Sequence, residues 1–199
     1  MNSLKSLSLA ILTAITFNAH AETLRVGSMS GQEAEIVYAA KEVAKKKFDL
    51  DVEVIEFDDY VTPNVALADG DIDANAFQHQ PYLDAMNRDR GFDIVAVGNT
   101  FVYPIGAYSN KIKSLDELSE GMTIALPNDP SNSGRSYLLL HKLGIITLKD
   151  PNSLESSSLD VKDNPKKLKF QEVDAAQLPR VLDEVDVALL TLIMRLMQA

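Results

Sequence analysis

The chain has 199 residues, of which 46% are hydrophobic, and it carries 19 lysines and arginines against 29 aspartates and glutamates. This length and composition can bury a substantial core in one or two domains. The net charge of -10 repels phosphate backbones, so nucleic acid is excluded as a partner. Cysteine is absent, which excludes disulfides, thiolate nucleophiles and sulfur-ligated metals.

The first 21 residues have the pattern of a secretory signal peptide. Lys5 supplies a positive charge, residues 7–17 form a short apolar run, and residues 19–21 (Ala-His-Ala) form a small-x-small cleavage site. The apolar run is shorter than the roughly 20 residues of a membrane span. We therefore expect an exported mature chain that begins at Glu22, in a bacterial periplasm. Because no cysteine lies at the cleavage site, lipid anchoring is not expected. A buried N-terminal helix is the alternative interpretation.

The first half of the chain alternates strands with helices. Alternating or apolar runs predict strands at residues 24–26, 51–57, 72–77 and 92–97. Helical spacing predicts helices at residues 33–47, 63–68 and 81–89. Glu33 and Glu35 lie in the first turn of the first helix, where the helix dipole favours negative charge.

The second half begins with an extended apolar segment, residues 101–108, which we expect to cross to a second lobe. Residues 114–117 form a capping box that opens a short helix. Further strands are predicted at residues 122–126, 169–173 and 185–190, and helices at residues 136–143 and 175–178. Residues 150–165 are predicted to be loop around one short strand, and residues 191–199 an apolar tail that forms a short terminal helix.

This order of elements predicts an α/β protein of two lobes joined by a hinge, with mostly parallel sheets. We expect a first α/β lobe at residues 22–103 and a second at residues 104–190. Two such lobes with a cleft between them form a ligand clamp that closes about the hinge. Ligands in open α/β sheets bind outside the carboxyl ends of the strands. Phe77 and the loop 128–135 both follow such strand ends.

Aromatic residues and a histidine cluster after the strand at residues 72–77. Phe77 and Tyr82, with Tyr60, could form the walls of an apolar pocket, and a thioether gains about 0.3–1.5 kcal/mol beside such rings. Ordinary core packing is an equal alternative for each ring. His79 is expected to be a hydrogen-bonding residue of the pocket or core rather than a catalyst.

One arginine lies just inside a predicted helix start. The guanidinium of Arg135 can hold a carboxylate in a bidentate grip, and the helix N-terminus beside it offers N–H donors. Asn132, Ser131 and Ser133 are expected either to add donors or to cap the helix. The alternative for Arg135 is an exposed side chain that pairs with a nearby acid. Aromatic walls and one arginine together suit a small zwitterion with an apolar side chain.

The sequence contains no motif that predicts catalysis, a cofactor or a metal. A Gly-x-Ser-x-Gly elbow, a phosphate loop and a His-x-x-x-His pair are all absent. Asp71 and Asp73 point the same way on a strand, but a third or fourth oxygen ligand is not evident, so we expect them at a turn. His141 is expected on a helix surface. The sequence therefore predicts a binding protein rather than an enzyme.

Five segments resemble the methionine-binding lipoproteins, the substrate-binding proteins of methionine ABC importers. The matching segments are residues 70–84, 95–105, 111–118, 128–135 and 177–180 within a resemblance over about residues 23 to 190. The resemblance implies a type II periplasmic-binding fold, methionine as ligand and an inner-membrane ABC transporter permease as partner. By matching position it implies that the side-chain pocket and the carboxylate site are formed by Tyr60, Phe77, His79, Tyr82, Asn132 and Arg135.

The chain departs from this family at both ends. The lipobox cysteine is absent, and residues 190–199 replace a motif like Ile-Asn-Thr-Asn-Tyr-Ala, whose asparagine contacts the ligand in the family. Codons for that motif, read one base out of frame, spell residues 190–198. We therefore hypothesise a frameshift near codon 190, which leaves the first lobe without its closing elements and an aberrant tail at residues 191–199.

The sequence thus predicts a monomeric periplasmic protein that delivers methionine to an ABC importer. The frameshift hypothesis adds the expectation that the 199-residue chain folds poorly and binds methionine weakly or not at all. A surface antigen or adhesion protein of the same fold without a transport role is the alternative function.

Overall fold

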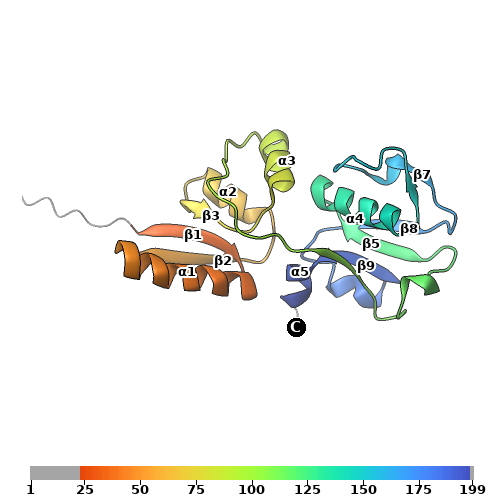
Figure 1. Ribbon diagram of the computed structural model, residues 1–199, viewed down its shortest axis with the longest axis horizontal. Coiled ribbons are helices and arrows are strands. Elements are labelled where there is room, and N and C mark those ends of the chain that lie inside the picture. The colour runs from red at the N-terminus through yellow and green to blue at the C-terminus, as the bar shows by residue number, and fades with distance from the viewer. Residues whose placement is uncertain (1–22, 198–199) are drawn as a thin grey trace, which may run out of the picture.

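The computed structural model describes residues 23–197, which form two α/β units that lie side by side (Figure 1). The first half of the chain builds a three-stranded sheet, here called sheet A, and the second half builds a four-stranded sheet, sheet B. The strands are β1 Leu24–Met29, β2 Val52–Phe57, β3 Ala74–Asn75, β4 Ile105–Tyr108, β5 Thr123–Pro127, β6 Thr147–Leu148, β7 Val161–Asp163, β8 Lys169–Val173 and β9 Val187–Thr191. The α-helices are α1 Gln32–Phe48, α2 Thr62–Ala68, α3 Gln80–Arg90, α4 Pro130–Lys142 and α5 Leu192–Leu196.

Sheet A has the strand order β2-β1-β3, and all of its strands are parallel. The register of β1 on β2 runs from Leu24 opposite Val52 to Met29 opposite Phe57. In Figure 1 helix α1 covers one face of this sheet, and α2 and α3 lie on the other. Helices between parallel strands are the connections that such a sheet requires.

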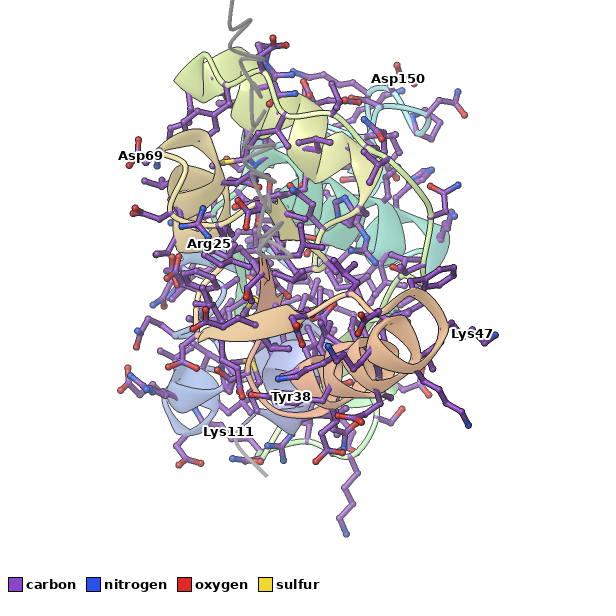
Figure 2. The ribbon with its side chains drawn as sticks, turned by 90° about the vertical axis from the view of Figure 1, so that its left-hand side faces the viewer. Arg25, Tyr38, Lys47, Asp69, Lys111 and Asp150 are labelled. Carbon is purple, nitrogen blue, oxygen red and sulfur yellow. The ribbon has the colours of Figure 1, made fainter. Side chains whose placement is uncertain are left out.

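Helix α1 forms as predicted, but most of its apolar side chains are not covered. Three lysines in the last turn and a left-handed residue at Asp49, with φ of 52°, end the helix. Only Glu33 and Ala34 are buried, whereas Ile36 and Val43 are about half exposed. Figure 2 views this end of the molecule and shows Lys47 projecting into solvent. The periodicity therefore predicted the helix correctly, but the row of apolar side chains along α1 does not face a hydrophobic core.

Sheet B has the order β4-β9-β5-β8. Strand β5 pairs in parallel with β8 and β9, while β4 runs antiparallel to β9. Buried residues on its two faces form two hydrophobic clusters, with Tyr137 and Leu140 of α4 in one and Leu178 and Ile193 in the other. The prediction of mostly parallel sheets is confirmed for sheets A and B, in which β4–β9 is the one antiparallel pair, while β6 and β7 form a separate antiparallel two-stranded sheet.

Four predictions of single elements are wrong or incomplete. Residues 92–97 form no strand, because no described strand lies beside them to accept their backbone hydrogen bonds. The predicted strand at residues 72–77 shortens to β3, and the helix predicted at residues 136–143 begins six residues earlier, at Pro130. Residues 175–178 form turns, and a short 3₁₀ helix follows at Arg180–Asp183.

The two halves are joined by the chain segment between α3 and β4 and by the packing of α5 against α1. Residues 91–104, which form no helix or strand, carry the chain from α3 to β4, so the crossing begins earlier than the predicted segment 101–108, whose last four residues are β4. Strand β9 then leads into α5, which packs against α1 of the first half and confirms the short terminal helix.

The predicted signal peptide lies outside the described residues. Within residues 23–197 no helix has the length and hydropathy to cross a membrane.

Candidate functional site

The six residues that the sequence singled out line one cavity between the two sheets. They come from the loops after β2 and β3, from α3 and from the first turns of α4, and they are Tyr60, Phe77, His79, Tyr82, Asn132 and Arg135. The cavity has a volume of about 30 Å³. Segments far apart in sequence thus meet at one cavity, as the rule that sites lie at the carboxyl ends of strands predicts.

Three aromatic rings form one wall of the cavity. The ring centroids of Tyr60 and Phe77 lie 6.1 Å apart with an angle of 30° between the planes. Tyr82 meets both rings edge to face, at 5.9 Å and 6.1 Å. The hydroxyl of Tyr82 donates to the backbone carbonyl of Tyr60 at 2.8 Å, which fixes the wall. Tyr60 and Phe77 line the cavity and also pack against the hydrophobic cluster that contains Leu178, so both alternatives stated for these rings apply.

His79 joins the aromatic wall to α4 through both ring nitrogens. It is the N-cap of α3, and its Nδ1 accepts a hydrogen bond from the backbone N–H of Tyr82 at 3.1 Å. Nδ1 is therefore unprotonated, and Nε2 carries the proton that it donates to Oδ1 of Asn132 at 3.2 Å. Burial lowers the pKa of His79, which favours this neutral form.

Arg135 lines the same cavity as the rings, from the first turns of α4. Its Nη1 donates to Oδ1 of Asn132 at 2.9 Å, and its Nη2 donates to the backbone carbonyl of Tyr103 at 2.8 Å. Burial lowers the pKa of Arg135, with the charge of Asp129 opposing that effect. A guanidinium has five N–H donors, and the described residues occupy two of them. Arg135 is therefore a half-buried cation with donors left for a carboxylate.

Asp129 caps α4, a role for which the sequence left several candidates open. Its carboxylate accepts from the backbone N–H and the side-chain amide of Asn132 and from the hydroxyl of Ser131. The hydroxyl of Ser133 donates to the carbonyl of Pro130. Both serine hydroxyls thus support the helix start, and Asn132 links Asp129, His79 and Arg135 into one network.

Two other polar candidates lie away from the cavity. Asp73 pairs with Arg25 at 2.8 Å in an exposed ion pair, so the Asp71 and Asp73 pair is not a metal site. In the part of the chain that the structure describes, no group of three metal-ligating side chains comes together. His141, expected at the surface, is half-buried and accepts weakly from the N–H of Leu148.

The cavity also contains residues that the sequence analysis did not select. Tyr103 comes from the crossing segment, and Thr191 and Ile193 come from the end of β9 and the start of α5. The hydroxyls of Thr191 and Tyr60 lie 2.6 Å apart, and the side chain of Ile193 is 2% exposed. The position of Thr191 at the carboxyl end of a parallel strand was a signal that could have identified it.

The cavity is small for its lining. Its volume of about 30 Å³ suits one water molecule, whereas pockets for small organic ligands measure about 300–1,000 Å³. A ligand that contacts the rings and Arg135 together must therefore displace side chains or separate the two sheets. Ile193 is buried against this cavity from the short helix α5, which makes it one of the side chains to be displaced.

Glu33 is a buried acid near this site. Its side chain is 4% exposed, and Oε2 has no hydrogen-bond partner among the described residues. Desolvation raises the pKa of Glu33 to about 8. The carboxyl is therefore largely protonated at neutral pH, so the helix dipole acts on the exposed Glu35 and not on a charge at Glu33.

Protonation of Glu33 predicts that the protein loses stability as pH rises. Between about pH 4.5 and pH 8 the unfolded carboxyl releases its proton while the folded one keeps it, so the free energy of unfolding falls by up to about 1.4 kcal/mol per pH unit. Urea unfolding from about pH 5 to pH 8 is expected to show this slope in the wild type and to lose it in Glu33→Gln. Glu35→Gln, which changes an exposed neighbour, is expected to keep it. Parallel slopes for the wild type and Glu33→Gln would contradict this prediction.

Comparisons with known proteins give the family. The family model of the NlpA lipoproteins matches residues 24–194. The D-methionine-binding lipoprotein MetQ of Escherichia coli (strain K12) is 58% identical over 166 residues, which cover 83% of this chain and 61% of that protein. Outer membrane lipoprotein 3 of Mannheimia haemolytica is 52% identical over 168 residues, or 84% of this chain and 64% of the relative. The chain therefore spans less than two thirds of the length of these relatives.

Solved structures give the same result. The crystal structure of the methionine-binding protein MetQ has a TM-score of 0.83 and 56% identity, and the match covers 85% of this chain and 70% of that one. A nutrient-binding protein from Burkholderia cenocepacia bound to methionine has a TM-score of 0.84 and 50% identity, and the match covers 87% of this chain and 73% of that one. These proteins are named for binding and not for catalysis.

The family model covers well over half of the chain, and the identities exceed half of the aligned residues. The expectation that the chain lacks a lipid anchor finds no support in the curated relatives, which are named as lipoproteins. The resemblance noted in the sequence is confirmed by family, identity and fold together: this α/β chain belongs to the NlpA lipoprotein family.

Proposed function

We propose that this chain is an exported substrate-binding protein whose ligand is methionine and whose partner is an inner-membrane ABC importer. The observation that carries the proposal is the convergence of the aromatic wall and Arg135 on one cavity. The rings suit a thioether side chain, and the free donors of Arg135 suit an α-carboxylate. Relatives named as methionine-binding proteins, and a solved neighbour bound to methionine, support the same ligand.

In this proposal each of the six residues has a role. Tyr60, Phe77 and Tyr82 hold the methionine side chain, and Arg135 binds its carboxylate. His79 and Asn132 position Arg135 and the aromatic wall by the hydrogen bonds between them. These roles involve binding and no chemical step.

We further propose that the lobes are residues 22–103 and 104–190 and that they open about the crossing segment. Contacts between the two halves support a clamp, since Tyr60 meets Thr191, His79 meets Asn132, and Arg88 pairs with Glu155 at 2.8 Å. Separation of the two lobes, one of the two ways in which a ligand larger than water could enter, would lengthen all three contacts. The energy of opening is taken from the binding free energy, so we expect methionine to bind more weakly than about 1 μM.

Calorimetric titration of the full chain with methionine tests this proposal. Norleucine, which replaces the sulfur by a methylene, is expected to bind about 2- to 12-fold more weakly because it loses the sulfur–aromatic contacts. Methionine methyl ester lacks the carboxylate charge and is expected to bind more weakly still. Equal affinities for the three ligands would contradict the proposed roles. The absence of any binding at millimolar methionine would contradict methionine as the ligand of this chain.

A further inference from the structure

The cavity offers a charged partner for only one end of an amino acid. The guanidinium of Arg135 has N–H donors left for a carboxylate. Among the described residues that line the cavity there are tyrosines, amides, a histidine and a threonine, but no aspartate and no glutamate. A buried charge needs a partner of opposite sign, because burial removes its hydration. The lining therefore lacks a counter-charge for an ammonium group.

Two acids lie near enough for their charges to act on the lining. Burial is the main cause that raises the pKa of Tyr60, and the charges of Glu33 and Asp129 add to it. The carboxylate of Asp129 is occupied, since it accepts hydrogen bonds from Ser131 and from the backbone and side chain of Asn132. The carboxyl of Glu33 is 4% exposed, and its Oε2 has no partner in the described structure. Of the two acids, Glu33 is therefore the one that can take a new partner.

The fold places Glu33 beside the cavity. It lies in the first turn of α1, which follows the carboxyl end of β1, the middle strand of sheet A. Met29, the last residue of β1, packs in one hydrophobic cluster with the cavity residues Tyr60, Tyr103 and Ile193. Burial, and after it the charge of Glu33, raises the pKa of Tyr103. The start of α1 thus borders the cavity at a strand end, where ligands of open α/β sheets bind.

Entry of a ligand brings it toward Glu33. Figure 1 shows α5 beside the end of α1 that follows β1, and the two helices pack together. Ile193 of α5 lines the cavity and is 2% exposed. The cavity of about 30 Å³ is too small for an amino acid. A ligand that displaces Ile193 therefore takes up space between the cavity and the start of α1.

We propose that Glu33 is the counter-charge of the ligand's ammonium group and that its carboxyl releases a proton to solvent when the ligand binds. This inference rests on the proposed function, because it concerns the same cavity and an amino acid as ligand. The O–H bond of the carboxyl breaks and its proton goes to the buffer, while the ammonium keeps all of its protons and donates to the carboxylate. Arg135 binds one end of the zwitterion and Glu33 the other.

Glu33 is the group expected to release the proton at pH 7. Burial raises its pKa to about 8, and an ammonium beside it favours the charged form. Burial also raises the pKa of Tyr60 and Tyr103, so neither phenol ionises near neutral pH. It lowers the pKa of His79, which is then already neutral at pH 7. The other charged groups on the first turn of α1 and on the elements around it are Glu35, Arg25, Glu53, Glu56, Asp58, Asp59, Arg195, Asp129 and Arg135.

Proton release on ligand binding tests this proposal. The full chain is titrated calorimetrically with methionine at pH 7 in phosphate and in imidazole buffer, whose different ionisation enthalpies reveal the protons released. The wild type is expected to release about 0.9 proton per bound methionine, because a carboxyl with a pKa of about 8 is mostly protonated at pH 7. Glu33→Gln has no such proton and is expected to release less than about 0.1. It is also expected to bind methionine at least about tenfold more weakly.

A control variant and a second ligand sharpen the test. Glu35→Gln changes an exposed neighbour on the same turn and is expected to release the proton and bind methionine like the wild type. 4-Methylthiobutanoate, which is methionine without its ammonium group, is expected to bind the wild type and Glu33→Gln equally and without proton release. A purely structural role of Glu33 would instead change the binding of both ligands alike.

The remaining outcomes separate this role of Glu33 from the proposed function. Methionine binding without proton release in the wild type, or equal release by Glu33→Gln, would overturn the role of Glu33 and leave the proposed function standing. An equal loss of affinity for methionine and 4-methylthiobutanoate in Glu33→Gln would overturn it as well. If the wild type bound no methionine, the proposed function would be contradicted, and this role of Glu33 with it.

Discussion

Replacement of Arg135 by alanine is expected to weaken methionine binding at least about 30-fold. The loss of a buried charge partner costs about 2–5 kcal/mol, because the ligand carboxylate is then left unpaired away from water. Lysine at this position keeps the charge but loses the planar fork, so Arg135→Lys is expected to lose at least tenfold. Isothermal titration calorimetry on the full chain measures both. Arg180→Ala, which removes an exposed arginine on a different element, is the control and is expected to bind like the wild type.

Arg135 also supports its surroundings, through Asn132 and the carbonyl of Tyr103. Methionine methyl ester separates that role from carboxylate binding. In the wild type the ester is expected to bind more weakly than methionine, whereas in Arg135→Ala the two are expected to bind equally. A difference that persists in Arg135→Ala would place the carboxylate elsewhere in the cavity.

Substitution of Gly134 by alanine is expected to destabilise the protein by about 3 kcal/mol or more. A Cβ at this position would lie 2.0 Å from the carbonyl oxygen of Leu154 and 2.6 Å from its carbonyl carbon. Because the obstacle is backbone, a side-chain rotation cannot relieve it, and overpacking of this kind is at the costly end of its range. Urea unfolding gives the free energy, and the midpoint is expected to fall with an unchanged slope.

Gly98→Ala is the matched control for Gly134→Ala. No atom lies within 4 Å of a Cβ added at Gly98, so its stability is expected to differ from the wild type by less than about 1 kcal/mol. If the free energy of unfolding of Gly134→Ala also lay within about 1 kcal/mol of the wild type, the loop at Leu154 would be shown to move away at little cost. The close approach of α4 to that loop would then not be what holds the start of α4, and with it Arg135, in place.

The site was largely predictable because it depends on local sequence and on one topological rule. Phe77 and Arg135 follow strands whose carboxyl ends meet at the cavity, which is why the strand-end rule brought them together. Thr191 and Ile193 were not predicted to line the site, because residues 191–199 were interpreted as an aberrant tail. Their place in the cavity follows from the strand order β4-β9-β5-β8, which pairs residues distant in sequence.

The sequence by itself determined the family, the alternation of strands and helices and the six residues of the candidate site, because periodicity, turn chemistry and motif are local properties. The tertiary structure alone decided which surfaces are covered. It left the apolar stripe of α1 half exposed, buried Glu33, and left residues 92–97 extended without a partner. Burial and strand pairing depend on what lies opposite a residue in space, and a pattern along the chain does not specify that neighbour.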